Sequence, residues 1–193
     1  MALTPSTMLE LGTRAPGLGL IDAVTNQTID LPKEGEANAL LIMFICNHCP
    51  YVVHVQAGIE SVAKDYQARG VKIIAINSNS EKTHPQDGPA NMKALAQARG
   101  WSFPFLFDPT QAVAKAYRAA CTPDFYVFDK NLRLTYRGRL DGSRPNSGVP
   151  VTGEDLRAAL DATLAGQPAT ETQRASMGCN IKWHPGQEPD YYG

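Results

Sequence analysis

The chain has 193 residues, of which 43% are hydrophobic and 19% are charged, and its formal net charge is −1. This is the composition of an ordinary globular protein, and the length suits one domain with a full core. A net charge near zero argues against nucleic acid or a membrane surface as a partner held by charge. Apolar runs all fall short of the roughly 20 residues that cross a membrane.

The N-terminus, Met-Ala-Leu-Thr-Pro-Ser-Thr-Met-Leu-Glu, lacks the basic start and apolar segment of a secretory signal. We therefore expect a cytoplasmic protein, although a mature chain whose signal has been removed would look the same. Stable structural disulfides are uncommon in the cytoplasm. The four cysteines are accordingly expected to serve redox or metal chemistry.

The first part of the chain predicts a hairpin followed by a strand–helix–strand unit. Residues 1–17 form an irregular lead-in, and Leu18–Val24 and Thr28–Leu31 are expected to pair as a hairpin. Ala39–Ile45 is an apolar run typical of a buried strand, and a helical pattern follows it from Pro50 to Arg69.

A second buried strand is predicted over Val71–Asn77. Because a helix connects this strand to the preceding one, the two strands are expected to be parallel. The polar segment Asn79–Pro89 that follows is either a solvated connection or a flap beside the active site. His84 within it is expected at the surface. A short helix is then predicted over Ala90–Arg99.

The next predicted elements are a short strand, Phe103–Phe107, and a helix from Val113 to about Tyr117. Asp108-Pro109-Thr110-Gln111 has the composition of a helix opening, with Asp108 as the N-cap and Gln111 at the third helical position.

The last elements are an antiparallel hairpin and a helix. Phe125–Asp129 and Leu132–Leu140 are expected to pair, and Thr152 is expected to cap a final helix that ends at Gly166. The tail, 167–193, shows no clear period.

The motif most informative about function is Cys46-Asn47-His48-Cys49-Pro50, which lies where a predicted strand passes into a predicted helix. Free N–H groups and the dipole at a helix N-terminus favour a thiolate over a thiol. We expect Cys46 to attack a disulfide, Cys49 to resolve the mixed disulfide, and His48 to stabilise the thiolate. A structural disulfide, half of a zinc site or two unrelated cysteines remain alternatives.

Four further residues are candidates for a role near this pair. The Thr122-Pro123 bond opens a strand and is a candidate cis peptide, which would offer backbone groups to a bound polypeptide. Cys121 is either a buried small side chain or an additional redox residue. Cys179 lies in the aperiodic tail, where Ile181 and Trp183 could hold it against the redox centre.

A metal site is a weaker interpretation. Cys46, His48, Cys49, Cys121 and Cys179 could supply four ligands, but structural zinc sites usually contain a second closely spaced pair. We therefore predict no metal and no cofactor.

Four segments together resemble the redoxin-type thioredoxin-like proteins of the alkyl hydroperoxide reductase and thiol-specific antioxidant superfamily. They are Cys46-Asn-His-Cys-Pro-Tyr-Val52, Phe107-Asp-Pro-Thr-Gln-Ala-Val-Ala-Lys-Ala-Tyr117, Cys121-Thr-Pro-Asp-Phe125 and Gly178-Cys-Asn-Ile-Lys-Trp183.

The resemblance spans about 18–183 and implies an α/β, thioredoxin-like three-layer fold. It implies a mixed central sheet with helices on both faces, an N-terminal hairpin and a C-terminal tail extension, with a domain over 18–166 and the tail packed on it. It further implies redox activity at the cysteine pair and a cis bond before Pro123.

The sequence departs from both main branches of this superfamily. Thioredoxins carry a buried acid six residues before the first cysteine, where this chain has Leu40. Peroxiredoxins carry a proline and a hydroxyl residue seven and three positions before their cysteine. Those positions are Ala39 and Met43 for Cys46, and Ile42 and Cys46 for Cys49.

The sequence thus predicts a thiol–disulfide oxidoreductase that acts on protein or small-molecule disulfides and thiols. A peroxiredoxin-like thiol peroxidase, with Cys179 as the resolving cysteine, is the alternative. A non-enzymatic zinc-binding module is the third interpretation.

Overall fold

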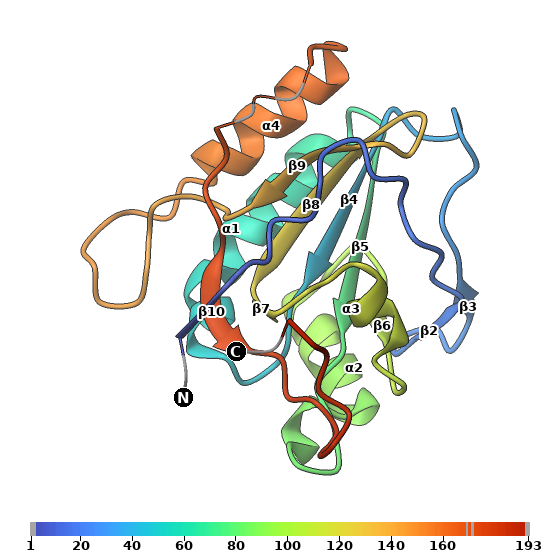
Figure 1. Ribbon diagram of the computed structural model, residues 1–193, viewed down its shortest axis with the longest axis vertical. Coiled ribbons are helices and arrows are strands. Elements are labelled where there is room, and N and C mark those ends of the chain that lie inside the picture. The colour runs from blue at the N-terminus through green and yellow to red at the C-terminus, as the bar shows by residue number, and fades with distance from the viewer. Residues whose placement is uncertain (1–2, 169, 171, 192–193) are drawn as a thin grey trace.

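The computed structural model describes residues 3–168, 170 and 172–191, and a seven-stranded mixed sheet forms its centre (Figure 1). No helix in these described ranges is long and apolar enough to cross a membrane. Across the sheet the strands are β3 (Thr28–Ile29), β2 (Leu20–Asp22), β6 (Phe105–Phe107), β5 (Val71–Asn77), β4 (Ala39–Phe44), β8 (Asp124–Asp129) and β9 (Leu134–Gly138).

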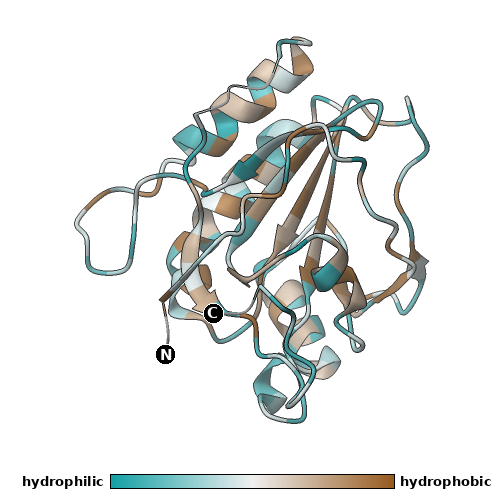
Figure 2. Ribbon diagram, in the orientation of Figure 1, coloured by the Kyte–Doolittle hydropathy of each residue, from teal (hydrophilic) through white to brown (hydrophobic). Residues whose placement is uncertain are grey.

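The pairing confirms the predicted topology. β4 runs parallel to β5, with Ala39 opposite Val71, and antiparallel to β8. β8 and β9 form the predicted hairpin, and β2 and β3 form the N-terminal one. The central strands are apolar along their length, as Figure 2 shows in brown, because both faces of the sheet are covered.

Helices cover both faces, which confirms the three-layer arrangement. Alternate residues of β4 point to opposite faces: Leu41 and Met43 belong to one hydrophobic core, and Leu40 and Ile42 to the other. The first core packs against α1 (Pro50–Gln67), α2 (Pro89–Arg99) and α4 (Glu154–Leu164). The second is covered by α3 (Ala112–Ala116) and by irregular segments from both ends of the chain.

A second, three-stranded sheet is a feature that the sequence did not predict. It joins β1 (Leu3–Pro5), β10 (Met177–Asn180) and β7 (Cys121–Thr122), all antiparallel, in the order β1-β10-β7. The strands are only two to four residues long, too short for alternation to show in the sequence. The tail then continues across the second core, where Ile181 and Trp183 are buried as expected.

The predicted opening of α3 was wrong by one turn. The helix begins at Ala112, after Gln111 in a left-handed conformation with a φ of 60°. Asp108 still serves the helix, because its Oδ2 accepts a hydrogen bond from the Ala114 N–H at 3.0 Å. It also accepts one from Ser78 Oγ at 2.9 Å, so Asp108 joins the helix to the end of β5.

The predicted cap of α4 was also displaced. Gly153, with a φ of 72°, is the N-cap in place of Thr152. Asp141 holds this turn, since its Oδ2 accepts hydrogen bonds from the backbone N–H groups of Thr152 and Gly153 at 2.8 and 2.7 Å.

Candidate active site

The cysteine pair lies where the sequence placed it, between β4 and α1. Cys49 is the N-cap of α1 and Pro50 occupies its first turn, so the helix N-terminus points at the two sulfurs. All four cysteines of the chain are free thiols and all are buried; Cys46 is 1% exposed.

The turn at Pro123 faces this pair. The Thr122–Pro123 peptide bond is cis, as expected. The Cys46 sulfur lies 3.4 Å from Thr122 Oγ1, and the Cys49 thiol, when protonated, donates to the Thr122 carbonyl oxygen at 3.3 Å. Thr122 therefore contacts both sulfurs, one through its hydroxyl and the other through its backbone.

The two thiols do not ionise alike. A hydrogen bond from the Cys46 thiol, supported by hydrogen bonds from Cys179 and from the Val52 backbone, outweighs burial and lowers the pKa of Cys49 to about 5. The pKa of Cys46 is raised well above its usual value by that same hydrogen bond, by burial and by the charge of Asp87. The geometry thus favours the negative charge on Cys49, whereas the sequence led us to expect it on Cys46.

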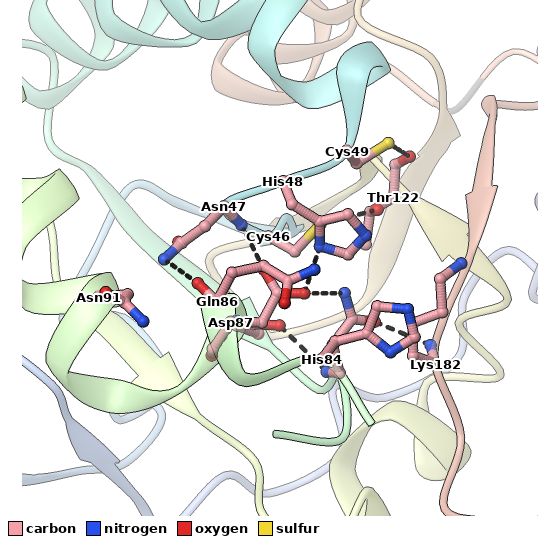
Figure 3. Close-up of polar contacts among 12 residues, drawn as sticks. Cys46, Asn47, His48, Cys49, His84, Gln86, Asp87, Asn91, Thr122 and Lys182 are labelled. Atoms are coloured by element: carbon pink, nitrogen blue, oxygen red, sulfur yellow. Dashed lines mark hydrogen bonds and ion pairs between the residues drawn. The ribbon is translucent and has the colours of Figure 1, made fainter. Parts of the chain in front are cut away.

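Asp87 is a candidate functional residue that the sequence analysis did not identify. It belongs to the short 3-10 helix η1 (Pro85–Asp87) in the predicted polar loop, yet its side chain is 0% exposed. Its carboxylate accepts hydrogen bonds from the Asn47 N–H at 2.9 Å, from Asn79 Nδ2 at 2.8 Å and from His48 Nδ1 at 2.5 Å. Figure 3 shows its contacts with Asn47 and His48.

A buried carboxylate therefore lies beside the thiols, although the thioredoxin position for such an acid holds Leu40. The only sequence feature that pointed toward Asp87 was the segment Asn79–Pro89, with its alternative interpretation as a flap beside the active site. Nothing in the run Pro85-Gln86-Asp87-Gly88-Pro89 marks its aspartate as buried.

Two histidines cover the Cys46 side of the centre. The His48 side chain is 19% exposed and is held by Asp87. The ring of His84 stacks on it, with ring centroids 5.2 Å apart, although the sequence placed His84 alone at the surface. Burial, followed by electrostatic interactions with His48 and Lys182, lowers the pKa of His84.

The other two cysteines also reach the centre. Cys179 lies on β10 directly opposite Thr122, and burial together with its hydrogen bond to Cys49 raises its pKa to about 12. Cys121 is buried on β7, and its sulfur lies 4.0 Å from the Pro123 carbonyl oxygen. Burial raises the pKa of Cys121, and the charges of Asp124, Cys49 and Cys179 add to that effect.

The described residues contain one group with metal-ligand spacing, and it differs from the thiol-rich set considered above. Ligand atoms of Cys46, His48 and Asp87 all lie within 4.8 Å of one another. Both carboxylate oxygens of Asp87 already accept hydrogen bonds. A metal ion would have to compete with those donors for Asp87.

Comparisons with known proteins place the chain in a family. An uncharacterized conserved protein from Geobacillus kaustophilus is 52% identical, with 96% of this chain and 98% of that chain covered and a TM-score of 0.93. A hypothetical protein from Sinorhizobium meliloti 1021 is 45% identical, with coverage of 95% and 100% and a TM-score of 0.91.

A more distant structure shares the fold alone. A protein described as a thiol:disulfide interchange protein from Chlorobium tepidum is 18% identical, with coverage of 81% and 99% and a TM-score of 0.63. A search of curated proteins found no match.

The model of the AhpC/TSA family matches residues 11–137. That span contains β4, the cysteine pair, Asp87 and Thr122–Pro123, and it covers well over half of the chain. The chain therefore belongs to the AhpC/TSA family, with a thioredoxin-like fold.

Proposed function

We propose that the protein is a thiol–disulfide oxidoreductase that uses Cys46 and Cys49. The observation that carries the proposal is the placement of the two sulfurs at the N-terminus of α1, where both contact Thr122. Such a pair has one thiolate available near neutral pH and a second thiol ready to close a disulfide.

The exchange begins when Cys46 passes its proton across the hydrogen bond to the Cys49 thiolate. The Cys46 thiolate attacks one sulfur of a substrate disulfide, forming a mixed disulfide, and the other substrate sulfur leaves as a thiol after taking a proton. Cys49 then gives up its proton and attacks Cys46. The Cys46–Cys49 disulfide forms and the second substrate thiol leaves, so two electrons and two protons pass from protein to substrate.

His48 and Asp87 support this chemistry from the same side. Asp87 fixes the His48 ring through the Nδ1 contact at 2.5 Å, which leaves the other ring nitrogen free for proton transfer. We assign to His48 the transfer of a proton to the first leaving thiolate, and to Asp87 the positioning of His48.

Cysteine variants test the assignment. Reduced protein should be oxidised by a small disulfide with formation of a Cys46–Cys49 bond, which peptide mass spectrometry would detect. Cys46→Ser should abolish the reaction, whereas Cys49→Ser should stop at a mixed disulfide on Cys46. Cys121→Ser serves as the matched control, because it removes a buried thiol of the same cluster. Full activity in Cys46→Ser would rule out the proposal.

A thiol peroxidase is the second candidate, and the contact between Cys179 and Cys49 favours it. A peroxide would transfer one oxygen to the Cys49 or Cys46 thiolate, giving a sulfenic acid and releasing water or an alcohol. From Cys49, condensation with the Cys179 thiol would give a disulfide and water. Stopped-flow peroxide consumption tests this: a rate no faster than that of a free thiol rules it out.

A zinc module is the third candidate, now with Cys46, His48 and Asp87 as the ligand group. Metal analysis of untagged protein decides this case, because a structural role requires stoichiometric zinc.

A further inference from the structure

The chain's own tail pairs with the strand that precedes the cis proline. β10 is hydrogen-bonded to β7, with Cys179 opposite Thr122 and Asn180 opposite Cys121. On its other side β10 is paired with β1. The backbone edge at Thr122, which the sequence suggested would receive a polypeptide, is therefore occupied.

This contact depends on a glycine. A Cβ added at Gly178 would overlap the Thr122 carbonyl oxygen and press on the carbonyl carbon at 2.8 Å. Both atoms belong to the backbone, so they cannot turn aside as a side chain can. Gly178 thus permits β10 to lie directly against the active-site turn.

Several contacts hold β10 in place from its C-terminal side. The Ile181 N–H donates to the Ala120 carbonyl at 2.9 Å, and the Lys182 N–H donates to Asn79 Oδ1 at 2.8 Å. Ile181 and Trp183 are buried in the second core. Moving β10 away from β7 would break these contacts as well as the strand pairing.

On the Cys46 side of the site, side chains rather than a paired strand cover the thiol. There Cys46 is shielded by the His48 side chain, which is 19% exposed and on which His84 stacks. Turning the His48 ring aside breaks its hydrogen bond to Asp87 and its stacking on His84, whereas displacement of a paired strand is a local unfolding event. A small molecule needs only the first of these motions to reach the Cys46 sulfur.

We propose that β10 acts as a specificity element that restricts the active site to small-molecule disulfides and excludes polypeptide disulfides. An extended polypeptide can dock on a protein by adding a strand to a free sheet edge. Here β10 already occupies the edge nearest the thiols. The inference rests on the proposed oxidoreductase activity and names its substrate class.

Two substrates with the same reactive bond test the proposal on the wild-type protein. One is bis(2-hydroxyethyl) disulfide, and the other is an unstructured peptide whose single cysteine carries a 2-hydroxyethyl disulfide. Reduced protein is mixed with each, and formation of the Cys46–Cys49 bond is followed by rapid acid quench and mass spectrometry. We expect the small disulfide to react at least about tenfold faster, because the peptide must first displace a strand.

The outcomes separate the two proposals. Equal or faster reaction of the peptide would overturn the specificity role while leaving the oxidoreductase activity intact. Reaction with neither substrate would overturn both.

A glycine pair provides a second test. Gly178→Ala should push β10 away from Thr122 and raise the rate of reaction with the peptide. The ratio of the small-disulfide rate to the peptide rate should therefore fall. Gly17→Ala is the matched control, since a Cβ there meets nothing within 4 Å, and its ratio should equal that of the wild type. A folded Gly178→Ala protein with an unchanged ratio would contradict the proposal; if that variant does not fold, the wild-type comparison decides.

Discussion

The single negative charge of the cysteine pair belongs mainly to Cys49. Hydrogen bonds from Cys46, Cys179 and the Val52 backbone lower its pKa to about 5. The thiolate should therefore be present above pH 5 and be lost as the pH falls through that value. The ultraviolet absorbance of thiolate in the reduced protein should show this transition.

The cysteine variants give the control for that titration. Cys49→Ser should abolish the transition, because the pKa values of the three remaining thiols are all raised by burial or by hydrogen bonding. Cys121→Ser should leave it unchanged. A transition that survives in Cys49→Ser and disappears in Cys46→Ser would place the charge on Cys46 instead.

Asp87 links the charge of the site to the position of His48. Asp87→Asn removes the negative charge that contributes to the raised pKa of Cys46, and weakens the hold on His48. We expect disulfide reduction to slow about 10- to 100-fold, and the pH at which Cys46 becomes alkylated to fall. Asp22→Asn, at a buried carboxylate on β2 that binds Thr25 and Phe105, is the control. An unchanged alkylation profile in Asp87→Asn would rule out the electrostatic role.

Asp124 should make stability depend on pH in a defined direction. Burial, only partly offset by hydrogen bonds from Tyr126, Ser6 and Ser176, raises its pKa from 3.8 to about 7. The folded protein thus binds this proton more tightly than the unfolded chain does. The stability that protonated Asp124 contributes is fully present below its unfolded pKa of 3.8 and is lost as the pH rises through about 7.

Asp124→Asn isolates this contribution, because other titrating groups are common to both proteins. Between pH 4 and pH 8, the free energy of unfolding of the wild type should fall by a few kcal/mol relative to the variant. Urea titrations of both proteins across this range would measure the difference. Parallel pH curves would contradict the prediction.

At the scale of elements, local patterns identified the parts of the site that are contiguous in sequence. The apolar run before Cys46 and the helical period after Pro50 placed the cysteine pair at the strand–helix junction. Asp87 could not be found in this way, because its burial arises from contacts with Asn47 and Asn79 that form only in the folded chain. β10 was missed because a four-residue strand containing a glycine has no detectable alternation.

Gln111 joins α3 to the tail beyond β10. Its Nε2 donates to the carbonyl oxygens of Ser78 and Lys182 at 2.7 and 2.9 Å, and its Oε1 accepts from the His184 N–H at 2.8 Å. Gln111→Ala should cost about 1–3 kcal/mol of stability. Hydrogen exchange should quicken at the His184 amide and stay unchanged in α1. Loss of protection throughout α1 would instead indicate global destabilisation.

At the scale of the molecule, segments near the two ends of the chain complete both the candidate active site and the second core. β1 and β10 form one sheet with the active-site strand β7. The tail then crosses the sheet face that α3 leaves partly uncovered, where Trp183 is buried and packs against Tyr191 with ring centroids 6.3 Å apart. Stability of the core and closure of the active site therefore depend on the same segment.

Trp183 provides a test of this dependence. Trp183→Ala removes a large buried ring and should destabilise the protein by about 3–5 kcal/mol. The indole Nε1 has no hydrogen-bond partner among the described residues, so Trp183→Phe removes an unsatisfied donor while keeping most of the ring, and should cost less than about 1.5 kcal/mol. Urea denaturation measures both. Equal losses in the two variants would mean that a phenyl ring at this position retains none of the stabilisation, which would contradict the prediction.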